Sequence, residues 1–142
     1  MILFGSRRSN PWAELFEPRL HYAAVYPEGA RSFFKERATK EPRVMFPANG
    51  KAGVPAADSY AVIALLPNLA NTGNVLFIEG LTMEGTDAAC EFLLNPQFCD
   101  LLVGRIIAEL GSLKPFEALL QLTPISGGSA NIRLIRLHAA LL

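Results

Sequence analysis

The chain has 142 residues, and its 13 basic and 13 acidic side chains leave it with no net charge. This length suits one domain, residues 1–142, and a hydrophobic content of 51% is enough for a packed core, which excludes a wholly disordered chain. The zero net charge argues against direct nucleic-acid binding, because proteins that bind the phosphate backbone on their own normally carry a basic excess.

The sequence carries no targeting or membrane signal that we recognise. The apolar run Met1–Phe4 is too short for a signal peptide. It also precedes the basic pair Arg7 and Arg8, whereas the apolar run of a signal peptide follows its basic residues. No apolar stretch approaches the ~18 residues of a membrane span. Cys90 and Cys99 form neither a CxxC nor a zinc-type pattern. These features predict a cytoplasmic protein with reduced thiols.

The first part of the chain predicts short elements separated by turns. Ser9 or Asn10 can cap a helix that starts at Pro11, and Pro18 stops it. The predicted elements are a buried strand at Met1–Phe4, a short helix at Pro11–Glu17, a strand at Leu20–Tyr26, one or two helical turns within Glu28–Lys40, and a short edge strand at Arg43–Phe46.

The second part predicts buried strands and two helices. Its first two strands are almost continuously apolar, which is typical of strands covered on both faces, and the link between them is too short for a crossover helix. We therefore expect them to be antiparallel or to lie apart. The predicted elements are strands at Asp58–Leu66 and Asn74–Glu79, helices at Thr86–Leu94 and Pro96–Leu110, and a hairpin of Phe116–Leu122 with Asn131–His138.

This order of elements predicts an α/β fold. We expect a three-layer sandwich with a mixed sheet, helices on both faces and a C-terminal antiparallel edge hairpin. Both ends of the chain are apolar, and core strands seldom begin or end a domain without a leader or tail. The chain is therefore either a domain with an unusually compact start or part of a longer regulatory protein.

Two loops that follow predicted strands and precede predicted helices are candidate ligand sites. The first contains Ser6, Arg7, Ser9 and Asn10, where free backbone N–H groups and the charges of Arg7 and Arg8 favour an anion. It matches neither the Walker loop nor the GxGxxG fingerprint. The alternative is an ordinary turn with a capped helix and solvated arginines.

The second loop contains Glu79, Thr82, Glu84 and Thr86, with two glycines that let the backbone approach a ligand closely. Ligands of open α/β sheets bind beyond the carboxyl ends of strands, which is where this loop lies. The two glutamates could also perform acid–base chemistry, although the spacing fixes no distance between them. The alternative is helix capping and complementation of the helix dipole.

The remaining candidates carry less chemistry. His21 and His138 have no ligand spacing that predicts a metal site, and no GxSxG motif supports a serine triad built on His21 and Asp58. The basic and aromatic stretch at residues 31–40 is diluted by glutamates and favours a solvated segment. We therefore assign no catalytic residue, metal or cofactor.

Two segments, GSRRSNPWAELFE and NVLFIEGLTMEGTDAACEFL, resemble an uncharacterised bacterial α/β domain. That domain is commonly found C-terminal to winged-helix or other helix-turn-helix DNA-binding modules. The resemblance implies an effector domain of a transcription regulator, with a DNA-binding module upstream. It implies no catalytic residues.

The combined expectation is a ligand-sensing or protein-interaction domain of a regulatory protein. A small polar or anionic ligand is expected where the two loops converge, and the hydrophobic helices and apolar last strand suggest a homodimer. One alternative is a small hydrolase or nucleotide-processing transferase that uses a loop carboxylate, which would require a buried carboxylate with a raised pKa in a cleft. The other is a purely structural dimerisation module.

Overall fold

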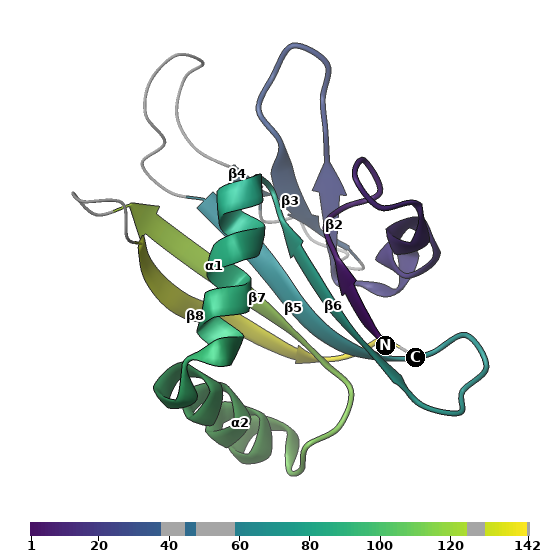
Figure 1. Cartoon of the computed structure of the whole chain (residues 1–142), viewed down its shortest axis with the longest axis vertical. Coiled ribbons are helices and arrows are strands. Elements are labelled where there is room, and N and C mark those ends of the chain that lie inside the picture. The colour runs from purple at the N-terminus through teal and green to yellow at the C-terminus, as the bar shows by residue number, and fades with distance from the viewer. Residues whose placement is uncertain (38–44, 48–58, 125–129, 142) are drawn as a thin grey trace.

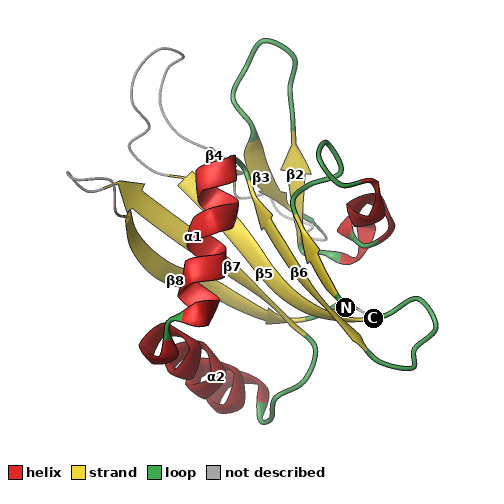
Figure 2. Cartoon of the chain, in the orientation of Figure 1, coloured by secondary structure: helices red, strands yellow, loops and turns green. Residues whose placement is uncertain are grey.

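The computed structural model of the chain describes residues 1–37, 45–47, 59–124 and 130–141. Within these ranges the fold is mixed α/β, with a five-stranded sheet, a three-stranded sheet, two α-helices and two short 3₁₀ helices (Figures 1 and 2). In chain order the elements are β1 (Ile2–Phe4), η1 (Pro11–Leu15), η2 (Glu17–Arg19), β2 (Tyr22–Val25), β3 (Phe33–Glu36), β4 (Met45–Pro47), β5 (Ser59–Pro67), β6 (Asn74–Gly80), α1 (Met83–Leu94), α2 (Pro96–Leu110), β7 (Phe116–Pro124) and β8 (Ala130–Ala139).

The larger sheet is mixed, as predicted, and has the strand order β1-β6-β5-β7-β8. Its central strand β5 pairs antiparallel with both β6 and β7, so that Ile63 lies between Ile78 and Ala118. The antiparallel pair β7–β8 forms one edge, which confirms the predicted edge pair, while its connection at residues 125–129 lies outside the described residues. At the other edge, β1 joins β6 in parallel.

The two faces of this sheet are covered by different elements. Alternate strand residues such as Ile63 pack with Phe92 and Ile106 of the α-helices, while their neighbours such as Val62 pack with Phe16 and Phe34. The prediction of helices on both faces is therefore corrected. Both α-helices cover one face (Figure 1), and the opposite face is covered by the smaller sheet β2-β3-β4 together with η1 and η2.

The main reason for this difference is β3, where helical turns were expected. Phe34 is fully buried and pairs with Ala24 of β2, so the segment gains both a core contact and a strand partner. The charged neighbours Lys35 and Glu36 hide the alternation that would have indicated a strand.

Helix boundaries follow the local capping signals. Helix α2 spans the predicted residues, and Gly111 ends it with a φ of +85°. Helix α1 begins at Met83, earlier than predicted, because the Thr82 hydroxyl accepts the Gly85 N–H at 3.1 Å. The predicted helix at Pro11–Glu17 consists of 3₁₀ turns, of which the first is capped by Asn10.

Some expectations concern residues that the structure does not describe. Of the predicted edge strand Arg43–Phe46, only the part within Met45–Pro47 is described, and Asp58 lies outside the described ranges. Across the described residues, the helices fall short of the length and apolar character that crossing a membrane requires.

Candidate functional site

The two candidate loops line one pocket. β1 and β6 are neighbouring parallel strands, so their carboxyl ends lie at the same edge of the sheet. Between the loops that continue from these ends lies a pocket of about 370 Å³. Its polar lining comes from Ser6, Arg8 and Ser9 of the first loop, from Thr82, Thr86 and Asp87 of the second, and from Tyr26 after β2.

The second loop is held in place by a close backbone approach. A Cβ on Gly80 would lie 2.2 Å from the Thr86 nitrogen and 2.5 Å from the Gly85 carbonyl carbon, so only glycine fits there. The Thr86 hydroxyl accepts the Gly80 N–H at 3.0 Å. The absence of a side chain at Gly80 therefore lets the first turn of α1 pack against the end of β6.

The first loop is a compact turn built on Ser6. The Ser6 carbonyl accepts the Asn10 N–H at 2.8 Å and the Ser9 hydroxyl at 3.2 Å, and Gly5 has a φ of +86° that favours glycine. Asn10 donates its side-chain amide to the Phe4 carbonyl at 3.1 Å and accepts the Trp12 N–H at 3.1 Å. Asn10 is therefore committed to capping and does not line the pocket.

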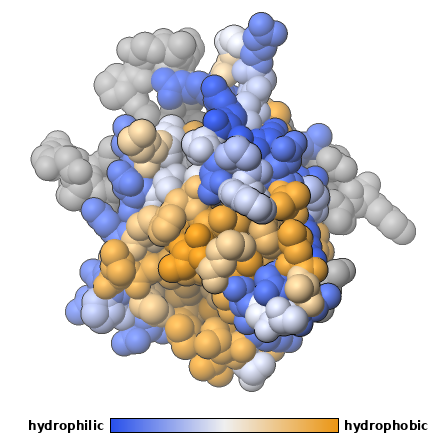
Figure 3. Space-filling view, turned by 45° about the vertical axis from the view of Figure 1, so that its right-hand side comes forward, coloured by the Kyte–Doolittle hydropathy of each residue, from blue (hydrophilic) through white to orange (hydrophobic). Residues whose placement is uncertain are grey.

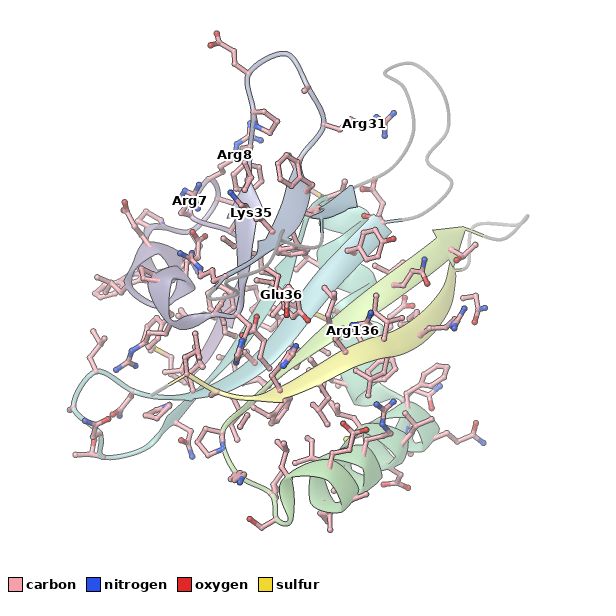
Figure 4. All side chains as sticks on the ribbon, turned by 180° about the vertical axis from the view of Figure 1, so that it is seen from behind. Arg7, Arg8, Arg31, Lys35, Glu36 and Arg136 are labelled. Atoms are coloured by element: carbon pink, nitrogen blue, oxygen red, sulfur yellow. The ribbon has the colours of Figure 1, made fainter. Side chains whose placement is uncertain are left out.

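The two arginines of the first loop have different surroundings (Figure 4). Arg7 forms an ion pair with the buried carboxylate of Glu17, which also accepts the Arg7 backbone N–H at 2.7 Å. The guanidinium of Arg8 lies 5.0 Å from the centre of the Tyr26 ring, on the pocket. The Arg7 guanidinium lies 5.3 Å from the centre of the same ring, but only Arg8 lines the pocket, and Arg7 is paired with Glu17.

A buried carboxyl group lies next to the pocket without lining it. Glu79 is fully buried, and the Tyr26 hydroxyl donates to its Oε1 at 3.1 Å, while Oε2 has no hydrogen-bond partner among the described residues. Burial, together with the nearby Glu17 carboxylate, raises the pKa of Glu79 to about 8. Glu79 is therefore mostly protonated at neutral pH and reaches the pocket only through Tyr26.

Four of the eight predicted site residues meet around the pocket and four do not. Ser6, Ser9, Thr82 and Thr86 line it, whereas Arg7, Asn10, Glu79 and Glu84 do not. Glu84 is exposed in the first turn of α1, where it complements the helix dipole. The sequence analysis missed Asp87, in the first turns of α1, and Tyr26, which closes a predicted strand and carries no local signal for a site.

A second buried carboxyl group ties β7 to β2. Glu117 accepts the backbone N–H groups of His21 at 2.5 Å and Tyr22 at 2.9 Å, and burial raises its pKa to about 7. The Tyr22 hydroxyl lies 2.7 Å from His138 Nε2, and the two histidine rings stack with centroids 4.4 Å apart. Among the described residues, no group of three His, Cys, Asp or Glu side chains could hold a metal ion. His21 and His138 instead contact residues of β8 and β2, respectively.

Comparisons of the chain with protein-family models, with curated proteins and with solved structures find no match. The features that bear on function are therefore those of the molecule itself: the pocket, its polar lining, and the Tyr26–Glu79 hydrogen bond beneath it.

Proposed function

We propose that the chain is a ligand-sensing domain of a regulatory protein and that its pocket holds a small polar or anionic molecule. The observation that carries the proposal is that the loops after two adjacent parallel strands line one pocket of about 370 Å³. Ligands of open α/β sheets bind at such strand ends, and small-molecule pockets commonly measure ~300–1,000 Å³. The resemblance of both loop segments to a regulator domain supports an upstream DNA-binding module and a cytoplasmic location.

The lining suggests what the ligand carries. Arg8 offers guanidinium donors, and its charge has no carboxylate partner among the described ion pairs, whereas the charge of Arg7 is matched by Glu17. Asp87 offers acceptor oxygens in the same pocket. This combination suits a molecule with an anionic group and hydroxyl groups, such as a hydroxy acid, a sugar phosphate or a nucleotide.

Thermal unfolding in the presence of four probes tests the proposal: inorganic phosphate, citrate, glucose 6-phosphate and AMP. A ligand at about 100 times its Kd adds about 2.7 kcal/mol to the stability, which raises Tm by roughly 5–10 °C for a chain of this size. Arg8→Gln should abolish most of this shift. The matched control is Arg105→Gln, which removes an exposed arginine paired with Glu109 on α2.

Two results would contradict the proposal. One is that none of the four probes raises the Tm of the wild-type chain. The other is that a probe raises the Tm of the wild type and of Arg8→Gln equally, because the bound molecule would then lie outside this pocket.

One observation favours a second candidate, a small hydrolase or nucleotide-processing transferase. Glu79 is a buried carboxyl group with a raised pKa, and the Tyr26 hydroxyl joins it to the pocket. In this reading Tyr26 would exchange a proton with the substrate and Glu79 would position and polarise the hydroxyl. Hydrolysis of 4-nitrophenyl phosphate by the wild type and by Glu79→Gln tests it, and an equal or absent turnover in both proteins would refute it.

A further inference from the structure

One part of the larger sheet is uncovered on its helical face. Leu3 of β1 is buried in the core of the opposite face, so Ile2 and Phe4 point to the side on which α1 and α2 pack. Helix α1 packs on β6 and β5, and α2 packs on α1 and β8. Ile2 and Phe4 therefore remain 56% and 49% exposed.

The flank of α1 that faces β1 carries three apolar residues, and Asp87 lies on the same side, four residues from Met83 and seven from Leu94. Met83, Cys90 and Leu94 are seven and eleven residues apart on the helix, which places them on one side of it. Met83 lines the pocket together with Phe4, so this side is the one turned toward β1. Met83 is 78% exposed and Leu94 is 82% exposed.

We call the surface formed by Ile2, Phe4, Met83 and Leu94 the β1–α1 face. Figure 3 shows a broad, continuous hydrophobic region on the side of the molecule where β1 lies. Polar side chains border it at the pocket end, where Arg8 and Asp87 lie. An apolar centre with a charged border is the usual anatomy of a protein–protein interface.

The size of this face can be compared with what a dimer needs. Large apolar side chains at these exposures each present roughly 100 Å². With the half-buried neighbours Leu76 and Cys90 the face offers roughly 500 Å² of apolar surface. A stable interface buries about 800 Å² on each partner, of which about 65% is apolar in homodimers. The apolar surface of the β1–α1 face is therefore close to the apolar area that a homodimer buries on each partner.

We propose that the β1–α1 face is the contact surface of a homodimer, in which a second copy of this chain covers it with the same face. A twofold interface requires a self-complementary patch, and the four apolar side chains of this face bring no like charges together. Asp87, on the same side of α1, lines the pocket together with the oppositely charged Arg8. The chain has no net charge, so two copies do not repel each other at long range. The dimer does not depend on a ligand, and its contact lies at the opposite edge of the sheet from β8.

Sedimentation equilibrium of the whole chain, from roughly 1 to 200 µM, tests the proposal. The expected species is a dimer of the 15.4 kDa chain. Ile2→Lys and Leu94→Lys should each raise the dissociation constant at least tenfold. A lysine at position 94 is also compatible with folding, because it lies in the last turn of α1, where a positive charge complements the helix dipole.

The matched control is Leu113→Lys, which charges an exposed leucine between α2 and β7 that is not one of the residues defining the β1–α1 face. It should leave the dissociation constant unchanged, and circular dichroism should show that all three variants are folded. A wild-type chain that stays monomeric at the highest concentration would overturn the proposal and leave this face to a different partner. So would a dimer that Leu113→Lys weakens as much as Leu94→Lys does.

Discussion

Replacing Glu79 by glutamine removes a titratable group from the interior and keeps the oxygen that accepts the Tyr26 hydroxyl. In the folded chain, burial raises the pKa of Glu79 from 4.5, its value in an exposed carboxyl group, to about 8. Between these two pH values the folded state holds a proton that the unfolded state has released. The free energy of unfolding therefore depends on pH through this one group.

The sign follows from which state binds more protons. Because the folded state binds more, the contribution of Glu79 to stability is complete below about pH 4.5 and is lost as the pH rises through about 8. The slope within this interval is about 1.4 kcal/mol per pH unit, and the whole interval corresponds to about 5 kcal/mol. Glu117 adds a slope of the same sign, since burial raises its pKa to about 7.

Urea unfolding followed by circular dichroism, between about pH 5 and 8, measures the effect. We expect the wild type to lose stability with rising pH and Glu79→Gln to lose about 1.4 kcal/mol less per pH unit. Glu84→Gln is the control, because it removes an exposed carboxyl group from the first turn of α1, five residues from Glu79. If the curves of the wild type and Glu79→Gln run parallel, the folded carboxyl group is already ionised and the reasoning is wrong.

Substitutions at three positions test the junction of β6 with α1 and the helices beside it, each by urea unfolding at one pH. Gly80→Ala should cost about 3 kcal/mol, because its Cβ would meet backbone atoms of Gly85 and Thr86 that cannot turn aside. Gly104→Ala should instead stabilise the chain by about 0.5–1 kcal/mol, since a Cβ there meets nothing within 4 Å in an exposed helix; a loss would refute this. Thr82→Ala should cost about 1 kcal/mol through loss of the α1 cap, and Thr82→Ser should restore most of it; equal stability of all three proteins would contradict the capping role.

The parts of the fold that the sequence predicted well have local causes. Helix α2 begins at Pro96, after the N-cap residue Asn95, and Gly111 is its C-cap. Its bounds are therefore determined by residues next to the helix ends. β3 was missed because its stability comes from pairing with β2 and from burying Phe34, and neither is visible within the segment. The placement of both α-helices on one face depends in turn on that missed strand.

The same distinction applies to the candidate site. The two loops could be predicted as candidate sites because each follows an apolar segment that reads as a strand, and the parallel pairing of β1 with β6 brings them together. Glu17 lies outside both loops and forms an ion pair with Arg7. Glu79 accepts a hydrogen bond from Tyr26, which is 53 positions away. Both faces of β6 are buried, so alternation along the strand could not show where Glu79 points.

The attachment of β1 to the sheet also determines the order of assembly. β1 pairs through only three residues, with Ile2 opposite Leu76, whereas β5 and β6 are joined by a short turn. Contacts between distant segments form late in folding, because a long loop must first close, and strands with few paired residues open most easily. β1 is therefore expected to dock last and to detach first, while β5, β6 and β7 stay paired. A ligand bound to Ser6 and Arg8, in the loop that follows β1, would then stabilise the attachment of β1 to the sheet.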